Sequence, residues 1–214
     1  MSWLKVLENY AKLKDPQKEL PAGVWVTSDE HTTTIFDGFE KAKYHLLILP
    51  RHPFRLEDGS ILPLKSLESL SHLAKSPHAL QVLRALQKQA DEVQEMIRDE
   101  MEKEEGFAWD VESMRHVHLH VISTDFVSPK LKNKKHWNSF RPDLGYFLQL
   151  SDVIAALERG QSPFDRTPKE YEELLKAELV SSYPPHQTFA TLPKLKDHLE
   201  DEWRSLRRIA KKEP

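Results

Sequence analysis

The chain contains no cysteine among its 214 residues. This absence excludes disulfide bonds, thiolate catalysis and metal sites built on thiolates, and it leaves the redox compartment undetermined. The sequence also lacks any apolar run near the ~18 residues that a membrane helix needs. Its N-terminal segment mixes apolar and charged positions at helical spacing and has no apolar signal core. These features predict a soluble intracellular protein with no membrane partner.

Neither sign of charge dominates the sequence. The chain has 31 Lys and Arg against 34 Asp and Glu, which gives a formal net charge of -3. Binding to nucleic acid or another anion must therefore depend on local basic clusters, because the field near a groove depends on nearby charges rather than on their sum. The length suits one main domain with an appendage.

Periodicity and turn residues predict the secondary structure. Three-and-four apolar spacing predicts helices over 2–14, 64–73, 77–105, 150–157, 171–175 and 194–210. Alternating and β-branched residues predict strands over 24–28, 32–36, 44–50, 107–111 and 116–123. A long helix between two groups of strands indicates an α+β core, with a mixed sheet packed by helices on one face. The segment "GQSPFDRTP" at 160–168 has the composition of a linker.

Three histidines, His116, His118 and His120, occupy alternate positions in "HVHLHVI". In a strand they share one face, with neighbouring imidazoles roughly 6.5 to 7 Å apart, which suits surrounding a single ligand. Three interpretations are open from the residues alone. They are a set of solvated surface histidines, a zinc site supported by carboxylates, and attack on phosphorus by a neutral imidazole. The nearby carboxylates are Asp110, Glu112 and Asp125.

A basic segment follows the histidines. Lys130, Lys132, Lys134 and Lys135 cluster there, and Trp137 lies beside them. This combination favours pairing with phosphates and stacking on bases. The alternative is a solvated basic loop.

These segments resemble a known family. "HVHLHVI" is similar to the His-φ-His-φ-His-φ-φ signature of the histidine triad superfamily of nucleotidyl hydrolases and transferases. "EKAKYHLLILPR" at 40–51 and "SMRHVHLHVISTDFVSPKLKNKKHWNSF" at 113–140 resemble the aprataxin branch, and with "LPKLKDHLEDEW" the resemblance spans about residues 24–205. It implies a histidine-triad α+β fold with a mainly antiparallel sheet. The implied regions are an N-terminal helix in 1–20, a catalytic domain with a basic DNA-contacting extension in 21–159, and a C-terminal helical region resembling a zinc finger in 160–214.

The resemblance also implies a function. Aprataxins remove AMP from the 5′ end of DNA after abortive ligation, through a covalent nucleotidyl-histidine. Carried over, His118 is the nucleophile, and His116 and His120 bind phosphate oxygens as charge develops. The residues implied to bind substrate are Lys41, Lys43, His45, Ser113, Met114, Ser128, Lys130, Lys132, Lys135, His136 and Trp137. Alternation would place Lys41, Lys43 and His45 on one strand face.

The implied partners are nicked or broken DNA that carries 5′-AMP, with AMP as the product, and the implied protein is a nuclear monomer. Two alternatives are a DNA-end binding protein of the same fold with weakened or absent catalysis, and a small-nucleotide hydrolase that ignores DNA. The first alternative follows from departures at the pocket. Glu40 and Glu112 stand where the family has Pro, and Trp109 stands where it has a pocket histidine. An anionic Glu112 would oppose a bound phosphate.

The C-terminal region departs from the family more sharply. Aprataxins end in a zinc finger with two cysteines, a His, and a second His or a Glu. Aligning on "LPKLKDHLEDEW" places Ser182 and Pro185 at the cysteine positions and leaves His198 and Glu202. A hydroxyl and a proline do not replace two thiolates, so the sequence predicts no structural zinc and no other cofactor. The expected replacement is packing by Phe189, Leu192, Leu195, Leu199 and Trp203.

Overall fold

The computed structural model of the protein describes residues 3–105, 111–114 and 118–210. Within these ranges the description leaves out the side chains of residues 3, 4, 105, 111–114 and 142. No helix in the described part of the chain is long and apolar enough to cross a membrane.

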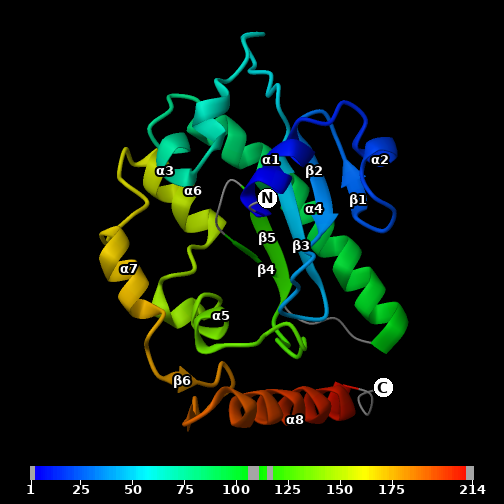
Figure 1. The fold of residues 1–214 in the computed structure, drawn as a ribbon, viewed down its shortest axis with the longest axis vertical. Helices are drawn as coiled ribbons and strands as arrows, with labels where there is room; N and C mark the ends of the chain where they lie inside the picture. The colour runs from blue at the N-terminus through cyan, green and yellow to red at the C-terminus, as the bar shows by residue number, and fades with distance from the viewer. Residues whose placement is uncertain (1–2, 106–110, 115–117, 211–214) are drawn as a thin grey trace.

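A five-stranded sheet lies at the centre of the molecule (Figure 1). Its strands are β1 (Trp25–Ser28), β2 (Thr32–Phe36), β3 (His45–Pro50), β4 (Val111–Met114) and β5 (Leu119–Ser123). Neighbours pair in the order β1-β2-β3-β5-β4, and every pair is antiparallel. The mixed sheet expected from the element order is therefore wrong. β3 and β4 run in the same direction, but β5 lies between them, so the long helix joins two strands that never pair.

Helices surround this sheet on several sides. They are α1 (Trp3–Ala11), α2 (Pro16–Glu19), α3 (Leu70–Leu73), α4 (Ala79–Glu105), α5 (Lys134–Asn138), α6 (Leu150–Glu158), α7 (Pro168–Leu174) and α8 (Leu192–Ala210). Single 3₁₀ turns occur at Leu64–Leu67 and Pro142–Leu144, and a two-stranded sheet pairs β6 (Leu179–Val180) with β7 (Thr188–Phe189). Ser69 caps α3 and Asn133 caps α5 by accepting backbone N–H bonds, which fixes where these short helices begin.

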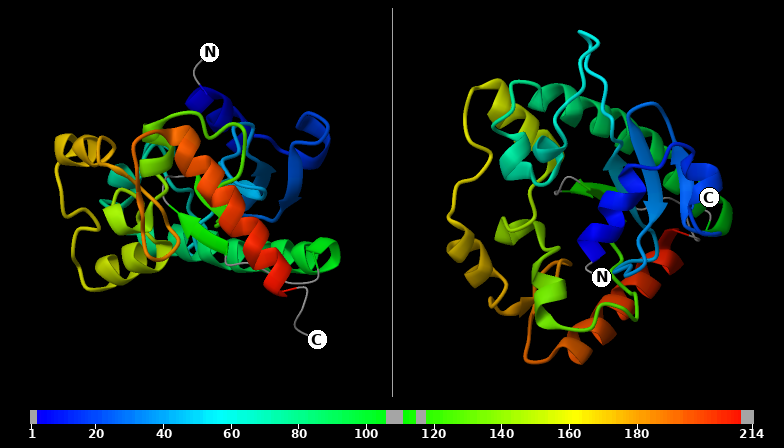
Figure 2. Two further views of the ribbon diagram at one scale, coloured as in Figure 1. Left: turned by 90° about the horizontal axis from the view of Figure 1, so that it is seen from below. Right: turned by 45° about the horizontal axis from the view of Figure 1, so that its top comes forward.

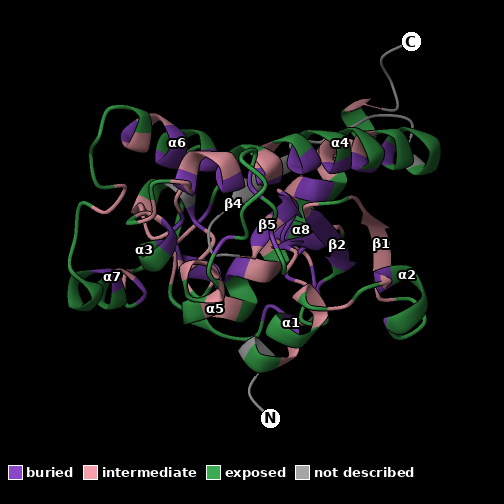
Figure 3. Cartoon of the chain, turned by 90° about the horizontal axis from the view of Figure 1, so that it is seen from above, coloured by how far each residue is buried: buried purple, intermediate pink, exposed green. Residues whose placement is uncertain are grey.

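Both faces of the sheet are covered, which corrects the expectation of helices on one face. Every residue of β3 is buried, and its side chains alternate between two clusters. Leu46 and Ile48 pack with α4. Leu47 and Leu49 pack with Leu7 of α1. Figure 3 shows the buried strands between α4 and α1. A chemical site on the α1 face must therefore lie beside the packed region.

The C-terminal region joins the sheet through one aromatic core. Trp137 of α5 has 1% exposure, and it packs with Ile122 of β5, Leu179 of β6 and Leu195 and Leu199 of α8. Its indole Nε1–H donates to the Val180 carbonyl at 3.0 Å. Figure 2, seen from below, shows α8 crossing this end of the molecule. This core attaches the tail directly to the strand that carries the histidines.

Candidate active site

Histidines from neighbouring strands meet on the sheet face opposite α4. The pairing of β3 with β5 sets Leu47 opposite His120, so His45 lies diagonally across from His120 on the same face. His45 Nε2 and His120 Nδ1 are 2.7 Å apart. The rings of His118 and His120 are 5.1 Å apart between centroids. His118 and His120 therefore lie together, as alternation predicted, while His116 lies outside the described residues.

The hydrogen bonds of His45 fix where its proton lies. The backbone N–H of Lys41 donates to His45 Nδ1 at 3.1 Å, so the proton of the neutral ring is on Nε2. That Nε2–H points at His120 Nδ1 and donates to it. Because Nδ1 accepts, a neutral His120 carries its own proton on Nε2. The pair thus forms a directed chain from the Lys41 backbone through two imidazoles.

Burial keeps His45 uncharged. Its side chain has no exposed surface. Desolvation, with smaller contributions from the charges of Lys41 and His118, lowers the pKa of His45 to about 3. His45 is therefore a neutral hydrogen-bonding group at every physiological pH.

Asp37 is a site residue that the sequence did not indicate, because Asp37-Gly38 reads as a simple turn. Its Oδ2 lies 3.3 Å from His45 Nε2 and 4.0 Å from His120 Nδ1. Burial raises the pKa of Asp37, while the Phe39 N–H, which donates to Oδ1 at 2.7 Å, acts against that rise. A carboxyl at this point stabilises positive charge that develops on either ring.

A cation could in principle use the same atoms. Donor atoms of Asp37, His45 and His120 lie within 4.8 Å of one another. To bind a metal, however, His45 Nε2 must lose its proton to Nδ1. Nδ1 would then face the Lys41 N–H as a second donor. The local hydrogen bonds therefore favour an imidazole chain over a metal site.

Asp125, one of the carboxylates considered for a zinc site, does not join the histidines. Asp125 is buried and accepts from the Ser123 hydroxyl and from the backbone N–H groups of Lys43 and Val127. Asp110 lies outside the described residues, and the side chain of Glu112 is not described. Asp125 therefore supports the backbone at the end of β5.

The two lysines before β3 do not share a strand face with His45, because the strand begins only at His45. Lys41 is buried, and its Nζ donates to the Phe39 carbonyl. Lys43 turns toward α4, where its Nζ pairs with Glu104 at 2.8 Å. The three-residue face expected from alternation is wrong, and only Lys41 stays near the histidines.

The basic extension divides into anchored and exposed residues. Ser128 is buried, and its hydroxyl donates to the Glu40 carbonyl at 2.8 Å. Lys130 Nζ bonds the Gly38 carbonyl at 2.9 Å and Glu40 Oε2 at 2.6 Å. His136 Nδ1 accepts the backbone N–H of Lys132 at 3.3 Å. Ser128 and Lys130 thus hold the loop after Asp37, and Glu40 pairs with a lysine that was expected to bind substrate.

Of the predicted DNA contacts in this extension, Lys132 and Lys135 are exposed. Trp137 is not available for stacking on a base, because its ring lies inside the core that joins the tail to β5. Trp137 was expected to contact DNA, but in the structure it is a core residue. Aromatic residues beside lysines suggest stacking in a sequence, but only the tertiary fold shows which rings are buried.

For the residues of β4 the structure describes the backbone and its pairing with β5, and not the side chains. The pairing sets Met114 opposite His120 and Ser113 opposite Val121. Both residues therefore lie on the strand next to β5, and their contact with substrate stays a prediction. Trp109 lies outside the described residues.

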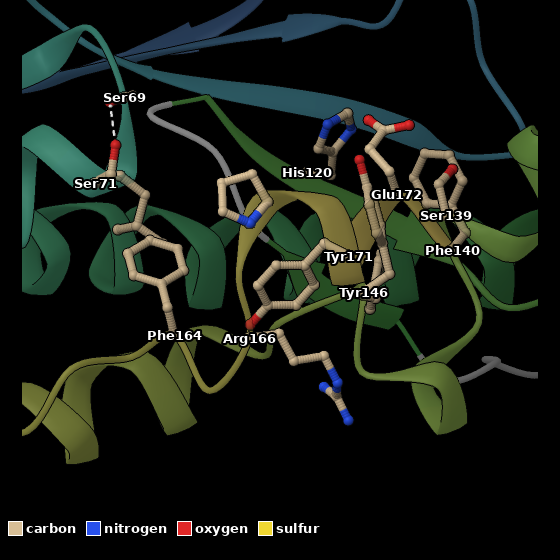
Figure 4. Close-up of a pocket in the computed structure, with 13 residues that line it drawn as sticks. Ser69, Ser71, His120, Ser139, Phe140, Tyr146, Phe164, Arg166, Tyr171 and Glu172 are labelled. Atoms are coloured by element: carbon tan, nitrogen blue, oxygen red, sulfur yellow. Dashed lines mark hydrogen bonds between the residues drawn. The ribbon is translucent and has the colours of Figure 1, made fainter. Parts of the chain in front are cut away.

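Aromatic residues that follow the basic extension complete the site. The Phe140 ring meets His45 and His120 edge-on, with centroid distances of 5.5 and 5.6 Å. A cavity of about 690 Å³ opens beside His120 (Figure 4). Tyr146 and Phe140 lie on one side of it, Ser71 and Phe164 lie on the other, and Tyr171 lies between them. The sequence did not indicate these residues, because they come from segments that meet only in the fold.

Comparison with known proteins agrees with this geometry. Residues 5–136 match the family model described as "Scavenger mRNA decapping enzyme C-term binding". The aprataxin-like protein of Saccharomyces cerevisiae is 30% identical over 229 residues, which cover 96% of this chain and 98% of that protein. The chain belongs to the aprataxin family. Zebrafish aprataxin is 38% identical over 191 residues, or 89% of this chain and 51% of the relative. This chain therefore spans about half the length of its vertebrate relatives.

Solved structures show the same histidine-triad fold. Hnt3 superposes with a TM-score of 0.63 at 21% identity, covering 95% of this chain and 96% of that one. A crystal structure of the aprataxin ortholog Hnt3 in complex with DNA superposes with a TM-score of 0.56 at 23% identity and the same coverage.

Residues 143–205 match a second family model, the C2HE, C2H2 and C2HC zinc-binding finger. In this chain Ser181 Oγ and His198 Nε2 share a hydrogen bond at 2.9 Å, and Ser181 has 2% exposure. Ser182 and Pro185 are exposed, so the residue facing His198 is one position earlier than the alignment expected. The zinc of such a finger is held by two thiolates together with an imidazole and a second imidazole, a carboxylate or a third thiolate. A hydroxyl against one imidazole does not fit that donor set.

Proposed function

We propose that this protein hydrolyses the bond between AMP and the 5′ end of DNA, through an AMP adduct on His118. Membership of the aprataxin family supports this reaction class. One solved structure with the same fold, that of the aprataxin ortholog Hnt3, is a complex with DNA. The observation that carries the proposal is the directed hydrogen bond from His45 to His120, with His118 next to His120.

The proposed reaction has two steps at phosphorus. A ring nitrogen of His118 attacks the phosphorus of the AMP moiety, the anhydride P–O bond breaks, and the DNA leaves with its 5′-phosphate. Water then breaks the P–N bond, which releases AMP and restores the imidazole. Because His45 holds His120 by Nδ1, the Nε2–H of His120 is the donor for a phosphate oxygen. By resemblance His116 has a similar role.

DNA binding by this chain is part of the same proposal. Lys132 and Lys135 are exposed on the basic extension and supply positive charge for backbone phosphates. Lys130 is instead a positioning residue, because it is bound to the loop that carries Asp37. A monomer acting in the nucleus remains a prediction.

Trapping of the intermediate tests the proposal. The protein is mixed with an adenylated nicked oligonucleotide, quenched, and analysed by mass spectrometry for an acid-labile AMP adduct. The expected result is an adduct in the wild type, its absence in His118→Ala, and AMP release only in the wild type. Salt-dependent DNA binding with neither adduct nor AMP would instead support a DNA-end binding protein. Turnover of nucleoside phosphoramidates at a rate that does not depend on salt concentration, with no activity on adenylated DNA, would support a small-nucleotide hydrolase.

A further inference from the structure

Two neighbouring hollows lie along α3, beginning at the histidines, and together are called the groove. The first, a cavity of about 690 Å³, is lined by His120, Ser71 and Phe164 among others. The second, of about 550 Å³, adjoins it at Ser71 and Phe164 and is also lined by Lys75 and Gly160. Ligand sites commonly have roughly 300 to 1,000 Å³. Two such hollows end to end suit a chain of several units better than a single small molecule.

Aromatic rings line the hollow beside His120. Tyr171 is buried, and its hydroxyl donates to Asp165 Oδ1 at 2.8 Å, which fixes the ring. Tyr146 is half-buried and meets the Tyr171 ring edge-on at 6.2 Å. Phe140 and Phe164 are also half-buried and line the same hollow. Partly exposed rings supported by a fixed neighbour form a surface on which nucleic-acid bases stack.

The charges of the groove indicate which part of a nucleotide enters. Arg166 Nη1 lies 3.0 Å from Asp165 Oδ2, so the cation in the first hollow is already matched. Glu172 adds an exposed carboxylate there, which repels phosphate but accepts N–H groups of a base. Lys75 is exposed in the second hollow. The first hollow therefore suits a base, and a phosphate fits better farther along.

We propose that this groove binds a single-stranded overhang at the DNA end, with one unpaired base stacked on Tyr146 beside His120. The proposal rests on the proposed function, because it places the processed 5′ end at the histidines and the unpaired strand in the groove. The groove thus selects DNA ends with unpaired nucleotides over blunt ends.

Fluorescence of 2-aminopurine in the overhang measures this binding directly, because stacking on a ring quenches it. Tyr146→Ala should weaken binding of the overhang DNA about 10-fold, which matches the loss of one stacked base. Tyr146→Phe keeps the ring and should retain the quenching. Ser71→Glu adds bulk and a negative charge at an exposed position where the two hollows meet, and should weaken binding without removing a packed side chain. Met96→Ala, at an exposed site on α4, is the control.

The outcomes separate this proposal from the proposed function. Quenching in the wild type that is lost in Tyr146→Ala and in Ser71→Glu supports the groove, even if no AMP is released from any substrate. Equal affinity for overhang and blunt DNA in the wild type, or quenching that survives in both folded variants, overturns it even if the His118 adduct forms.

Discussion

The sheet face and the C-terminal finger each hold a histidine by hydrogen bonds, yet the two regions keep different parts of the family pattern. On the sheet, His45 and His120 form a buried pair beside Asp37 and next to His118. In the finger, His198 is held by the hydroxyl of Ser181 at 2.9 Å. The first region keeps groups that suit chemistry at phosphorus, whereas the second keeps its shape without the thiolates of a zinc site.

The difference shows what each region needs from its side chains. A reaction at phosphorus depends on imidazoles in a set orientation, so its residues cannot be exchanged for apolar ones. A structural metal only holds segments together, and packing can do the same. Phe189 lies 4.9 Å from the His198 ring, and Leu195 and Leu199 are fully buried beside the finger strands. A finger can therefore lose its metal ligands and still hold α8 against the domain.

The largest effect is expected where the two regions meet. Trp137→Ala removes the ring that packs against both β5 and α8, so it should lower the free energy of unfolding by about 3–5 kcal/mol. Lys135→Ala, two residues earlier and exposed, should change stability by less than about 0.5 kcal/mol. Urea unfolding measures both. A Trp137→Ala variant that is as stable as the wild type but binds DNA more weakly would contradict this, because Trp137 would then contact DNA.

Acid should lower the free energy of unfolding, because His45 is buried in its neutral form. The folded pKa of His45 is about 3, and the reference value is 6.5. The unfolded state therefore binds the proton first, so the stability that depends on neutral His45 is complete above pH 6.5 and falls as the pH drops toward 3. Burial raises the pKa of Asp37, which acts in the opposite direction. The free energy of unfolding is therefore measured for the wild type and for His45→Leu between pH 3 and pH 6.5. It should fall more steeply with acid in the wild type. Parallel stability curves would contradict the account.

The smallest effects are expected in the finger. Ser181→Ala removes the hydroxyl that bonds His198, and should cost about 1 kcal/mol of folding stability. Ser182→Ala, at the neighbouring exposed position, should cost almost nothing. A chelator should leave the melting temperature of the full chain unchanged, because Ser182 and Pro185 stand at the two cysteine positions of the finger and neither replaces a thiolate. A large drop in melting temperature on adding chelator, restored by zinc, would show that the tail binds metal after all.

Much of the fold follows from the sequence because its signals are local. The strands at 32–36 and 44–50 and the helix at 77–105 agree with β2, β3 and α4 to within two residues. Alternation predicted a strand over 107–111, of which residues 107–110 lie outside the described part of the chain. The structure shows that β4 also includes residues 112–114, which pair with β5. That pairing is not visible in one segment of the sequence.

The site was harder to predict than the fold. The alternating histidines were visible, since period two is the signal of a strand face. Asp37 was not predicted as a site residue, because Asp-Gly is a common turn sequence. Phe140 and Tyr146 carry no local pattern that indicates a contact with His120. Lys43 was misplaced because alternation was extended to residues before β3 begins. Long-range contacts decided each of these cases.

The most direct test of the account is a single-turnover measurement of AMP release with His45→Leu. If His45 only orients His120, release should slow on the order of 100-fold while the affinity for adenylated DNA stays unchanged. The fold of the variant is checked by its melting temperature at pH 7. Weaker DNA affinity with an unchanged rate would contradict the account, because His45 would then be a substrate ligand.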